Sequence, residues 1–386
     1  MTHFQNSRRA LFIFFLLIAI PCVCKGQIYK YLGIEDGLNN RRIFRIQKGG
    51  RGYMWFLTQE GIDRYDGKTV KHYTVLDGNM EVAPHVNLNW LYTDSSHTLW
   101  TVGRKGRVFR YDAVCDRFLM VYKFPGLQDT ETATLHYACM DNNDRIWLCH
   151  GDSIVRYDIR TGTTERLNSP STENITAFTQ KDSTYFFIGT SNGLLQVREK
   201  EGVLETVTGA CTDNIRTPVS ELYFHTGSKK LFVGTFKEGI LMYDTQAAPA
   251  VVADGTLQNV GINRIAPFGE RQLLIATGGR GVYRLDVDSL GAKPYITADY
   301  GSYNGMNGNN INDIYVDEDG RIWMANYPTG VTVRNDRYRS YKWLKHSHGN
   351  SSSLANDQVH DVIRDGEGDP VSYTHLRAHE TSQDLV

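Results

Sequence analysis

The chain has 386 residues, and its 42 lysines and arginines nearly balance its 43 aspartates and glutamates. Because no overall basic field results, we expect no nucleic-acid contact by this region and no binding to anionic membrane surfaces. The hydrophobic fraction of 41% is sufficient for a buried core, and the length suits one large all-β domain or two average domains.

The beginning of the chain, residues 1–26, has the layout of a secretory signal peptide. Arg8 and Arg9 precede an apolar stretch over residues 11–24, which is shorter than the roughly 20 residues that a helix needs to cross a bilayer. We therefore predict cleavage near Gly26 and export to the periplasm. An uncleaved membrane anchor is the alternative.

A phrase then recurs along the chain. It consists of an apolar-alternating segment, a polar turn, a short apolar strand, a loop, and a strand that begins with Gly and often ends in Tyr-Asp. The apolar strands are marked by Trp55, Trp100, Trp147, Phe187, Phe232, Leu274 and Trp323, which are 45, 47, 40, 45, 42 and 49 residues apart. This period is typical of four-stranded propeller blades and is too long for leucine-rich or ankyrin repeats.

Seven complete copies predict an all-β fold over residues 27–345, a seven-bladed β-propeller of four-stranded antiparallel blades, with the marked residues packed between blades. Residues 28–33 resemble the outer strand expected at 69–73. We therefore expect the N-terminal strand to complete the last blade and to remove its open edge. An eighth first strand begins at Val359, so residues 346–370 are predicted to be the truncated start of a second propeller.

Three polar segments between strands resemble ligand loops without completing one. Residues 141–144 and 317–320 lack the closing Glu of a twelve-residue calcium loop. Residues 278–281 lie between two expected strands, whereas a nucleotide loop precedes a helix. We interpret all three segments as turns.

The cysteines after the leader show no metal-ligand spacing and no CxxC pair; they are Cys115, Cys139, Cys149 and Cys211. Free cysteines are among the most buried residues, so we expect buried thiols. A chain of this size needs no disulfide scaffold. The sequence predicts neither a metal site nor a cofactor.

The C-terminal residues 371–386 read like one frame of a common transposon-based sequencing adapter. We interpret them as an assembly artefact that interrupts the natural protein near Pro370. His375, His379 and Glu380 are therefore excluded from any metal-site argument.

The repeats resemble the two-component regulator propeller repeat. Residues 36–40, the strand around Trp55, the Tyr-Asp-Gly of residues 65–67 and residues 353–359 carry the resemblance. It implies the periplasmic sensor region of a hybrid two-component sensor histidine kinase/response regulator, of which this chain is an N-terminal fragment. It further implies an oligosaccharide ligand, a homodimer in the full-length protein, inner-membrane anchoring through a missing downstream segment, and transcription control by phosphorelay through a missing kinase.

The loops between second and third strands are the candidate binding site, because propeller function usually lies in loops at one face. Their candidate residues are Arg104, Lys105, His150, Phe236, Lys237, Arg280 and Tyr327. If the blades are equivalent, these cations and aromatic faces converge on one rim, where they could hold an anionic sugar. A merely solvated rim is the alternative.

Two other classes of function remain open. A carbohydrate-active propeller enzyme would need convergent carboxylates or a His and Tyr pair at the axis. Most Asp and Glu residues fall in repeat turns, so the sequence indicates no catalytic residue and no enzyme activity for this fragment. A protein-interaction scaffold would bind a partner and no small molecule.

Overall fold

A computed structural model describes residues 28–76, 87–125, 127, 133–207, 215–245, 257–298, 305–335, 354, 356, 358–364 and 370–373. The predicted signal peptide, Cys211 and most of the predicted adapter segment lie outside these residues. The chain divides into two compact units, one formed by Tyr29–Asp336 and the other by the two terminal segments.

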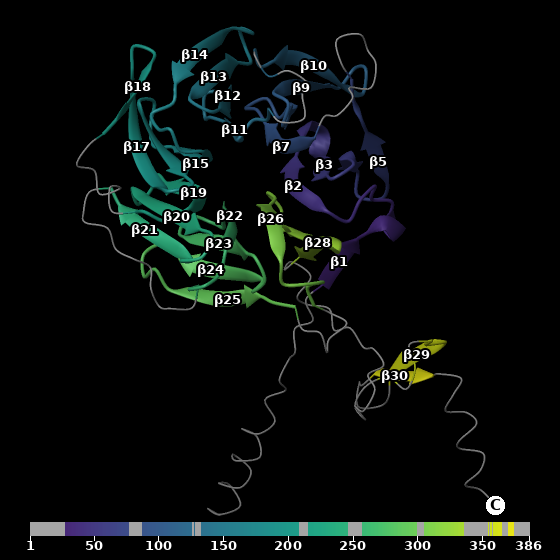
Figure 1. The fold of residues 1–386 in the computed structure, drawn as a ribbon. Coiled ribbons are helices and arrows are strands. Elements are labelled where there is room, and N and C mark those ends of the chain that lie inside the picture. Colours follow the sequence, from purple (N-terminus) through teal and green to yellow (C-terminus); the bar gives the residue numbers. More distant parts are fainter. Residues whose placement is uncertain are drawn as a thin grey trace, which may run out of the picture. The chain divides into compact units, whose positions relative to one another are not determined.

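Tyr29–Asp336 contains seven β-sheets that stand in a ring, each with its first strand towards the centre (Figure 1). Blade 1 consists of β2 (Ile43–Lys48), β3 (Met54–Thr58), β4 (Gly61–Tyr65) and β5 (Val70–Tyr73); blade 2 of β7 (Leu88–Thr93), β8 (Leu99–Gly103), β9 (Arg107–Asp112) and β10 (Arg117–Lys123); and blade 3 of β11 (Tyr137–Met140), β12 (Arg145–His150), β13 (Ser153–Asp158) and β14 (Thr164–Asn168). Blade 4 consists of β15 (Ile175–Gln180), β16 (Tyr185–Thr190), β17 (Gly193–Lys200) and β18 (Val203–Thr206), and blade 5 of β19 (Val219–His225), β20 (Lys230–Thr235) and β21 (Ile240–Asp244). Blade 6 consists of β22 (Ile262–Pro267), β23 (Gln272–Thr277), β24 (Val282–Asp286) and β25 (Ala292–Ile296), and blade 7 of β26 (Ile311–Val316), β27 (Ile322–Asn326), β28 (Gly330–Asn335) and β1 (Ile28–Leu32). The all-β, seven-bladed propeller is confirmed.

Two blades depart from four strands. Blade 2 gains a fifth strand, β6 (Val75–Leu76), which pairs in parallel with β10. Blade 5 has three strands among the described residues, which break off at 245 and resume at 257. Two short 3-10 helices lie in connections. η1 (Ile34–Asp36) joins β1 of blade 7 to β2 of blade 1, and η2 (Gly50–Gly52) joins β2 to β3 within blade 1.

The ring is closed by the N-terminal strand, as the sequence predicts. β1 lies beside β28, so the last blade takes its outer strand from the start of the chain. The approach is close at Gly330, which has φ of 102° and where a Cβ atom would lie 2.3 Å from the Leu32 carbonyl oxygen. Only glycine fits there, which explains the Gly that opens the third strand of the repeat.

The large residues that mark the second strands lie in the core. Trp55, Trp147 and Trp323 are at most 4% exposed, and they pack against aromatic residues of neighbouring blades. The predicted turns at 141–144 and 317–320 support them, because each first Asp accepts the indole Nε1–H six residues later, at 2.8 and 2.9 Å. These carboxylates also accept backbone N–H groups, so turn chemistry is confirmed.

Blade 1 lacks this hydrogen bond. Gly49 occupies the place of the Asp, and a Cβ there would lie 2.7 Å from the Trp55 Nε1. The Trp55 Nε1–H is buried without a hydrogen-bond partner among the described residues. Blade 1 therefore lacks the turn carboxylate that accepts the indole N–H in blades 2, 3 and 7.

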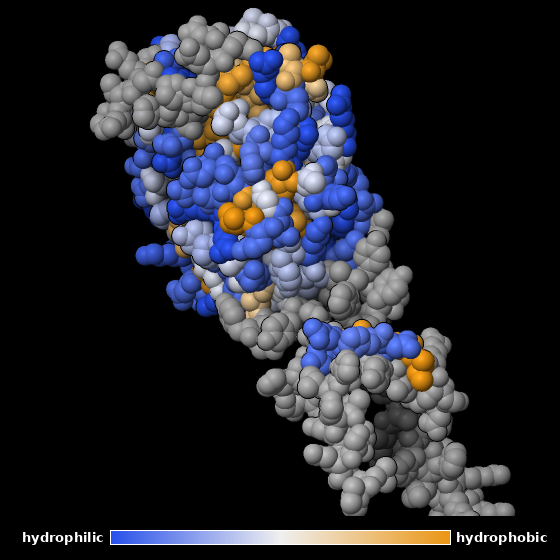
Figure 2. All heavy atoms as spheres, turned by 90° about the vertical axis from the view of Figure 1, so that its right-hand side faces the viewer, coloured by the Kyte–Doolittle hydropathy of each residue, from blue (hydrophilic) through white to orange (hydrophobic). Residues whose placement is uncertain are grey.

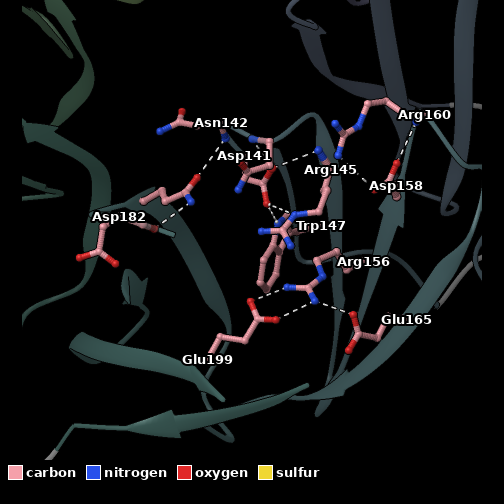
Figure 3. Close-up of polar contacts among 12 residues, drawn as sticks. Asp141, Asn142, Arg145, Trp147, Arg156, Asp158, Arg160, Glu165, Asp182 and Glu199 are labelled. Atoms are coloured by element: carbon pink, nitrogen blue, oxygen red, sulfur yellow. Dashed lines mark hydrogen bonds and ion pairs between the residues drawn. The ribbon is translucent and has the colours of Figure 1, made fainter. Parts of the chain in front are cut away.

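Two ion pairs between neighbouring blades involve an arginine that lies over a tryptophan ring. Arg156 of β13 is 7% exposed, lies over the Trp147 ring, and reaches Glu199 of the next blade with two hydrogen bonds of 2.5 and 2.7 Å (Figure 3). Glu165 of its own blade accepts a further hydrogen bond. Arg64 repeats the arrangement between blades 1 and 2 by bonding Asp116 at 3.0 Å.

The side of the propeller that carries β5 is mostly hydrophilic, with small separate hydrophobic patches (Figure 2). Among the described residues, no helix is long and apolar enough to span a membrane.

The expectation of buried thiols holds for Cys139 and Cys149, where burial raises the thiol pKa. It is wrong for Cys115, which is exposed because it lies in the hairpin turn between β9 and β10.

The second unit contains one described hairpin. β29 (Asp361–Arg364) pairs antiparallel with β30 (Pro370–Tyr373), and Val362 and Ile363 are 58% and 61% exposed. β29 coincides with the expected first strand of an eighth repeat. β30 includes three residues, 371–373, of the segment that we attribute to the adapter, and both assignments remain predictions.

Candidate functional site

Six of the seven inner strands share a β-bulge at their first residues, whereas β11 of blade 3 pairs with β12 without a register shift. At each bulge the residue between two paired residues is left out of the ladder. The flanking pairs are Ile43/Arg45, Leu88/Trp90, Ile175/Ala177, Val219/Glu221, Ile262/Arg264 and Ile311/Asp313 of the described strands. A bulge leaves one residue outside the ladder and changes the direction of its side chain. These extra residues therefore face the neighbouring blade at the end of the ring where the second-to-third-strand loops lie.

Most of these extra residues link the blades. Their side chains donate to the carbonyl that opens the next inner strand: Thr176 to Val219 at 2.6 Å, Ser220 to Ile262 at 2.6 Å, Asn263 to Ile311 at 2.8 Å and Asn312 to Ile43 at 2.9 Å. Phe44 holds the equivalent place in blade 1 and has no polar group to donate. The series of inter-blade hydrogen bonds therefore ends at Phe44.

A charged cluster lies one residue further along the inner strands. Arg264 forms ion pairs with Glu221 at 2.9 Å and with Asp313 at 3.3 Å. Asp313 also accepts the Ile46 N–H at 2.7 Å, which ties blade 7 to blade 1. Burial raises the pKa of Glu221, and the positive charges of Arg264 and Arg45 act against that rise. Carboxylates thus do converge near the axis, contrary to the sequence analysis.

Beside this cluster lies a cavity of about 500 Å³, which we call the axial pocket. Its lining comes from blades 1, 2, 5, 6 and 7 and consists of Arg42, Phe44, Arg45, Asn89, Trp90, Ser220, Phe236, Ile262, Asn263, Asn310, Asn312 and Tyr327. The lining contains two arginines, four asparagines and four aromatic residues, and it contains no carboxylate. It offers flat apolar faces together with amide and cationic hydrogen-bond donors.

The two arginines of the axial pocket differ in their surroundings. The Arg42 guanidinium lies 5.1 Å from the centre of the Tyr327 ring and 5.9 Å from that of Phe44, within cation–π distance. Arg45 is half-buried and donates to the Phe44 carbonyl at 3.1 Å. Neither arginine forms an ion pair with a described carboxylate.

The structure places six of the seven residues predicted from the sequence in the second-to-third-strand loops and His150 at the end of β12, but only two of the seven line the axial pocket. Phe236 and Tyr327 line it and are 55% and 37% exposed. Arg104 borders it, because its Nε lies 2.9 Å from the side-chain oxygen of Asn89 when that amide is turned towards it. Lys237 and Arg280 are exposed outside the lining.

Lys105 and His150 do not form part of an open rim. Lys105 is only 7% exposed, because its ammonium turns inward to the Ala133 carbonyl at 3.3 Å. The Nδ1 of His150 lies 2.9 Å from the Thr134 carbonyl oxygen, and its ring centre lies 5.7 Å from that of His136. Lys105 is therefore buried, and both Lys105 and His150 lie outside the lining of the axial pocket.

A second cavity, of about 660 Å³, lies at the opposite ends of the strands of blades 1 to 3. Its carboxylates are already engaged, since Asp94 accepts the Trp100 Nε1–H at 2.8 Å and Asp144 accepts the Ser95 N–H at 2.9 Å. Among the described residues, no group of three or more His, Cys, Asp or Glu could hold a metal ion. The axial pocket is therefore the candidate site.

Comparisons with known proteins agree with the fold. A family model described as "Two component regulator propeller" matches residues 305–327, which include β26 and β27. The chain thus contains a two-component regulator propeller repeat, as its sequence suggested. No curated protein matches the chain.

Solved structures with the same fold include extracellular domains of two-component systems. One is the extracellular domain of a protein described as a hybrid two-component system from B. thetaiotaomicron, with 22% identity and a TM-score of 0.65 over 90% of this chain and 47% of that chain. A second such domain from B. thetaiotaomicron has 17% identity and a TM-score of 0.60 over 90% of this chain and 44% of that chain. The chain therefore spans about half the length of these domains.

An enzyme also shares the fold. A catalytically inactive variant of virginiamycin B lyase from Staphylococcus aureus, solved with quinupristin, has 14% identity and a TM-score of 0.60 over 80% of this chain and 99% of that chain. The propeller scaffold by itself therefore does not separate a sensor from an enzyme.

Proposed function

We propose that this chain is the exported, ligand-sensing propeller region of a hybrid two-component sensor and that it binds a glycan-derived oligosaccharide in the axial pocket. The main support for this proposal is the lining of that pocket, which contains four aromatic residues and four asparagines. Aromatic faces and amides are suited to the apolar faces and hydroxyl groups of a sugar. The cavity of about 500 Å³ falls within the usual range for small-ligand sites, about 300–1,000 Å³.

The regulator propeller repeat and the extracellular domains that share the fold support the remaining parts of the proposal. The leader directs the chain to the periplasm, and a downstream membrane segment anchors the full-length protein. Ligand binding then controls transcription through a downstream kinase, in a homodimer. Sequencing the gene beyond the codon for Pro370 tests this part, because an open reading frame without a kinase would refute it.

Calorimetric titration of the chain without its leader against neutral and charged oligosaccharides tests ligand binding. We expect Tyr327→Ala and Phe236→Ala each to weaken binding about tenfold, because each removes an exposed aromatic face from the lining. Val114→Ala is the matched control, since Val114 is 95% exposed in a turn outside the pocket. Unchanged affinity in both pocket variants would refute this site.

A second candidate is a carbohydrate-active enzyme. It is favoured by Glu221 and Asp313, which converge on Arg264 beside the pocket, and by the raised pKa of Glu221. Incubation with the same oligosaccharides followed by mass spectrometry distinguishes the two, because a sensor returns its ligand intact and a lyase or hydrolase shortens it. A scaffold that captures a protein partner would bind none of the sugars.

A further inference from the structure

We infer that the ligand of the axial pocket is anionic and that the Arg45 guanidinium binds its carboxylate or sulfate group. This inference rests on the proposed function and adds the chemical class of the ligand and the residue that selects it. Three observations carry it: the free hydrogen-bonding capacity of Arg45, the engagement of its neighbour Arg264, and the absence of acid from the pocket lining.

Arg45 has the capacity to bind an anion. A guanidinium carries five N–H donors, and the described contact of Arg45 is one hydrogen bond of 3.1 Å from Nη1 to the Phe44 carbonyl. Its side chain lines the axial pocket and is half-buried, where charge-assisted hydrogen bonds are stronger than in open water. A carboxylate or sulfate can accept two parallel hydrogen bonds from such a group.

Arg264, one of the other axial arginines, is already neutralised. Its Nη1 reaches Glu221 at 2.9 Å and its Nε reaches Asp313 at 3.3 Å. The bulge that directs Arg264 also occurs at Arg45, so the two side chains hold equivalent places in blades 6 and 1. The same position therefore serves an internal ion pair in blade 6, whereas Arg45 in blade 1 forms no ion pair with a described carboxylate and acts on Glu221 only at longer range.

The pocket lining favours negative charge as a whole. Its charged members are Arg42 and Arg45, and no aspartate or glutamate is among them. Arg42 lies over the ring of Tyr327, which holds the second guanidinium beside an exposed aromatic face. A sugar stacked on Tyr327 would thus meet a cation on the pocket wall as well as Arg45.

Neutral and charged oligosaccharides test the inference. Trigalacturonate and its methyl ester share one backbone and differ in charge, and a sulfated galactose oligosaccharide supplies a sulfate group. Each is titrated calorimetrically into the chain without its leader. We expect at least one of the two charged probes to bind 10- to 100-fold more tightly than the ester, the usual range for a charge-assisted contact. The charged probe that binds tells a carboxylate from a sulfate ligand.

Arg45→Gln should remove this preference, so that the charged probe binds no more tightly than the ester. Arg160→Gln is the matched control, because Arg160 is an exposed arginine of the second cavity. If Arg45→Gln does not fold, the salt dependence of the unmodified protein replaces it, since added NaCl should weaken binding of the charged probe and not of the ester.

The outcomes separate the two proposals. Equal affinity for ester and charged probes, or a charge preference that survives Arg45→Gln, overturns the inference and leaves the sugar-binding function standing. Absence of binding by every charged and neutral oligosaccharide overturns both.

Discussion

Removal of the Arg156 guanidinium should weaken the junction of blades 3 and 4. Arg156 is buried, forms two hydrogen bonds with Glu199, bonds Glu165, and lies 5.1 Å from the Trp147 ring centre (Figure 3). Arg156→Met keeps most of the side-chain volume but leaves the Glu199 carboxylate, whose side chain is only 17% exposed, without its cation.

The expected loss is about 2–3 kcal/mol in the free energy of unfolding. Breaking a fully buried pair costs about 3–5 kcal/mol, and solvent at Glu199 and at the half-exposed Glu165 screens part of that cost. Urea unfolding followed by tryptophan fluorescence measures it. The double variant Arg156→Met/Glu199→Gln should recover more than half of the loss, because the one carboxylate then left without its cation, Glu165, is 44% exposed and hydrated.

A single variant within about 0.5 kcal/mol of the unmodified protein would refute this reasoning, because the ion pair would then contribute nothing measurable. A double variant no more stable than the single one would show that lost packing on Trp147, and not the stranded carboxylate, causes the effect. Arg198→Met provides the matched control, since its ion pair with Glu205 is 43% and 47% exposed and should cost less than about 1 kcal/mol.

Three further predictions concern the ring and its turns. Gly330→Ala should lower the melting temperature in calorimetry more than Gly320→Ala, because an added Cβ meets a β1 carbonyl at 2.3 Å only at Gly330; equal shifts would contradict closure by β1. Asp141→Ala should destabilise by about 2–3 kcal/mol in urea titrations, because Trp147 keeps a buried, unpaired indole N–H; retained stability would contradict that origin. Burial raises the pKa of Asp116, but hydrogen bonds from Lys71, Tyr111 and Tyr73 outweigh this effect and hold the pKa below its usual value. Its contribution is complete above the unfolded pKa of about 3.9 and is lost as the pH falls from there through the lower folded pKa, so Asp116→Asn should flatten the fall in the urea midpoint below about pH 4.

The sequence by itself determined the number of blades, the second strand of each, and the closing strand. These features follow from local patterns, because a four-stranded blade repeats its Gly, its turn Asp and its large core residue within 40–49 residues. Residues 28–33 could be assigned to blade 7 because an open sheet edge leaves backbone groups unpaired. The glycine at 330 reflects the same contact.

Only the tertiary structure decided the candidate site. Arg42, Phe44 and Arg45 precede or open an inner strand, and alternation alone does not reveal the bulge that redirects them. A polar residue at that place, such as Asn263 or Asn312, was the one sequence signal available, since it interrupts an apolar strand.

The remaining differences have the same cause. Glu221, Arg264 and Asp313 are each more than 40 residues apart in the sequence, yet the ring brings them within ion-pair distance near its axis. The burial of Lys105 depends on Ala133, 28 residues later in the connection between blades 2 and 3. Periodicity specifies what each blade contains, whereas the contacts between blades depend on side-chain directions that only the closed ring defines.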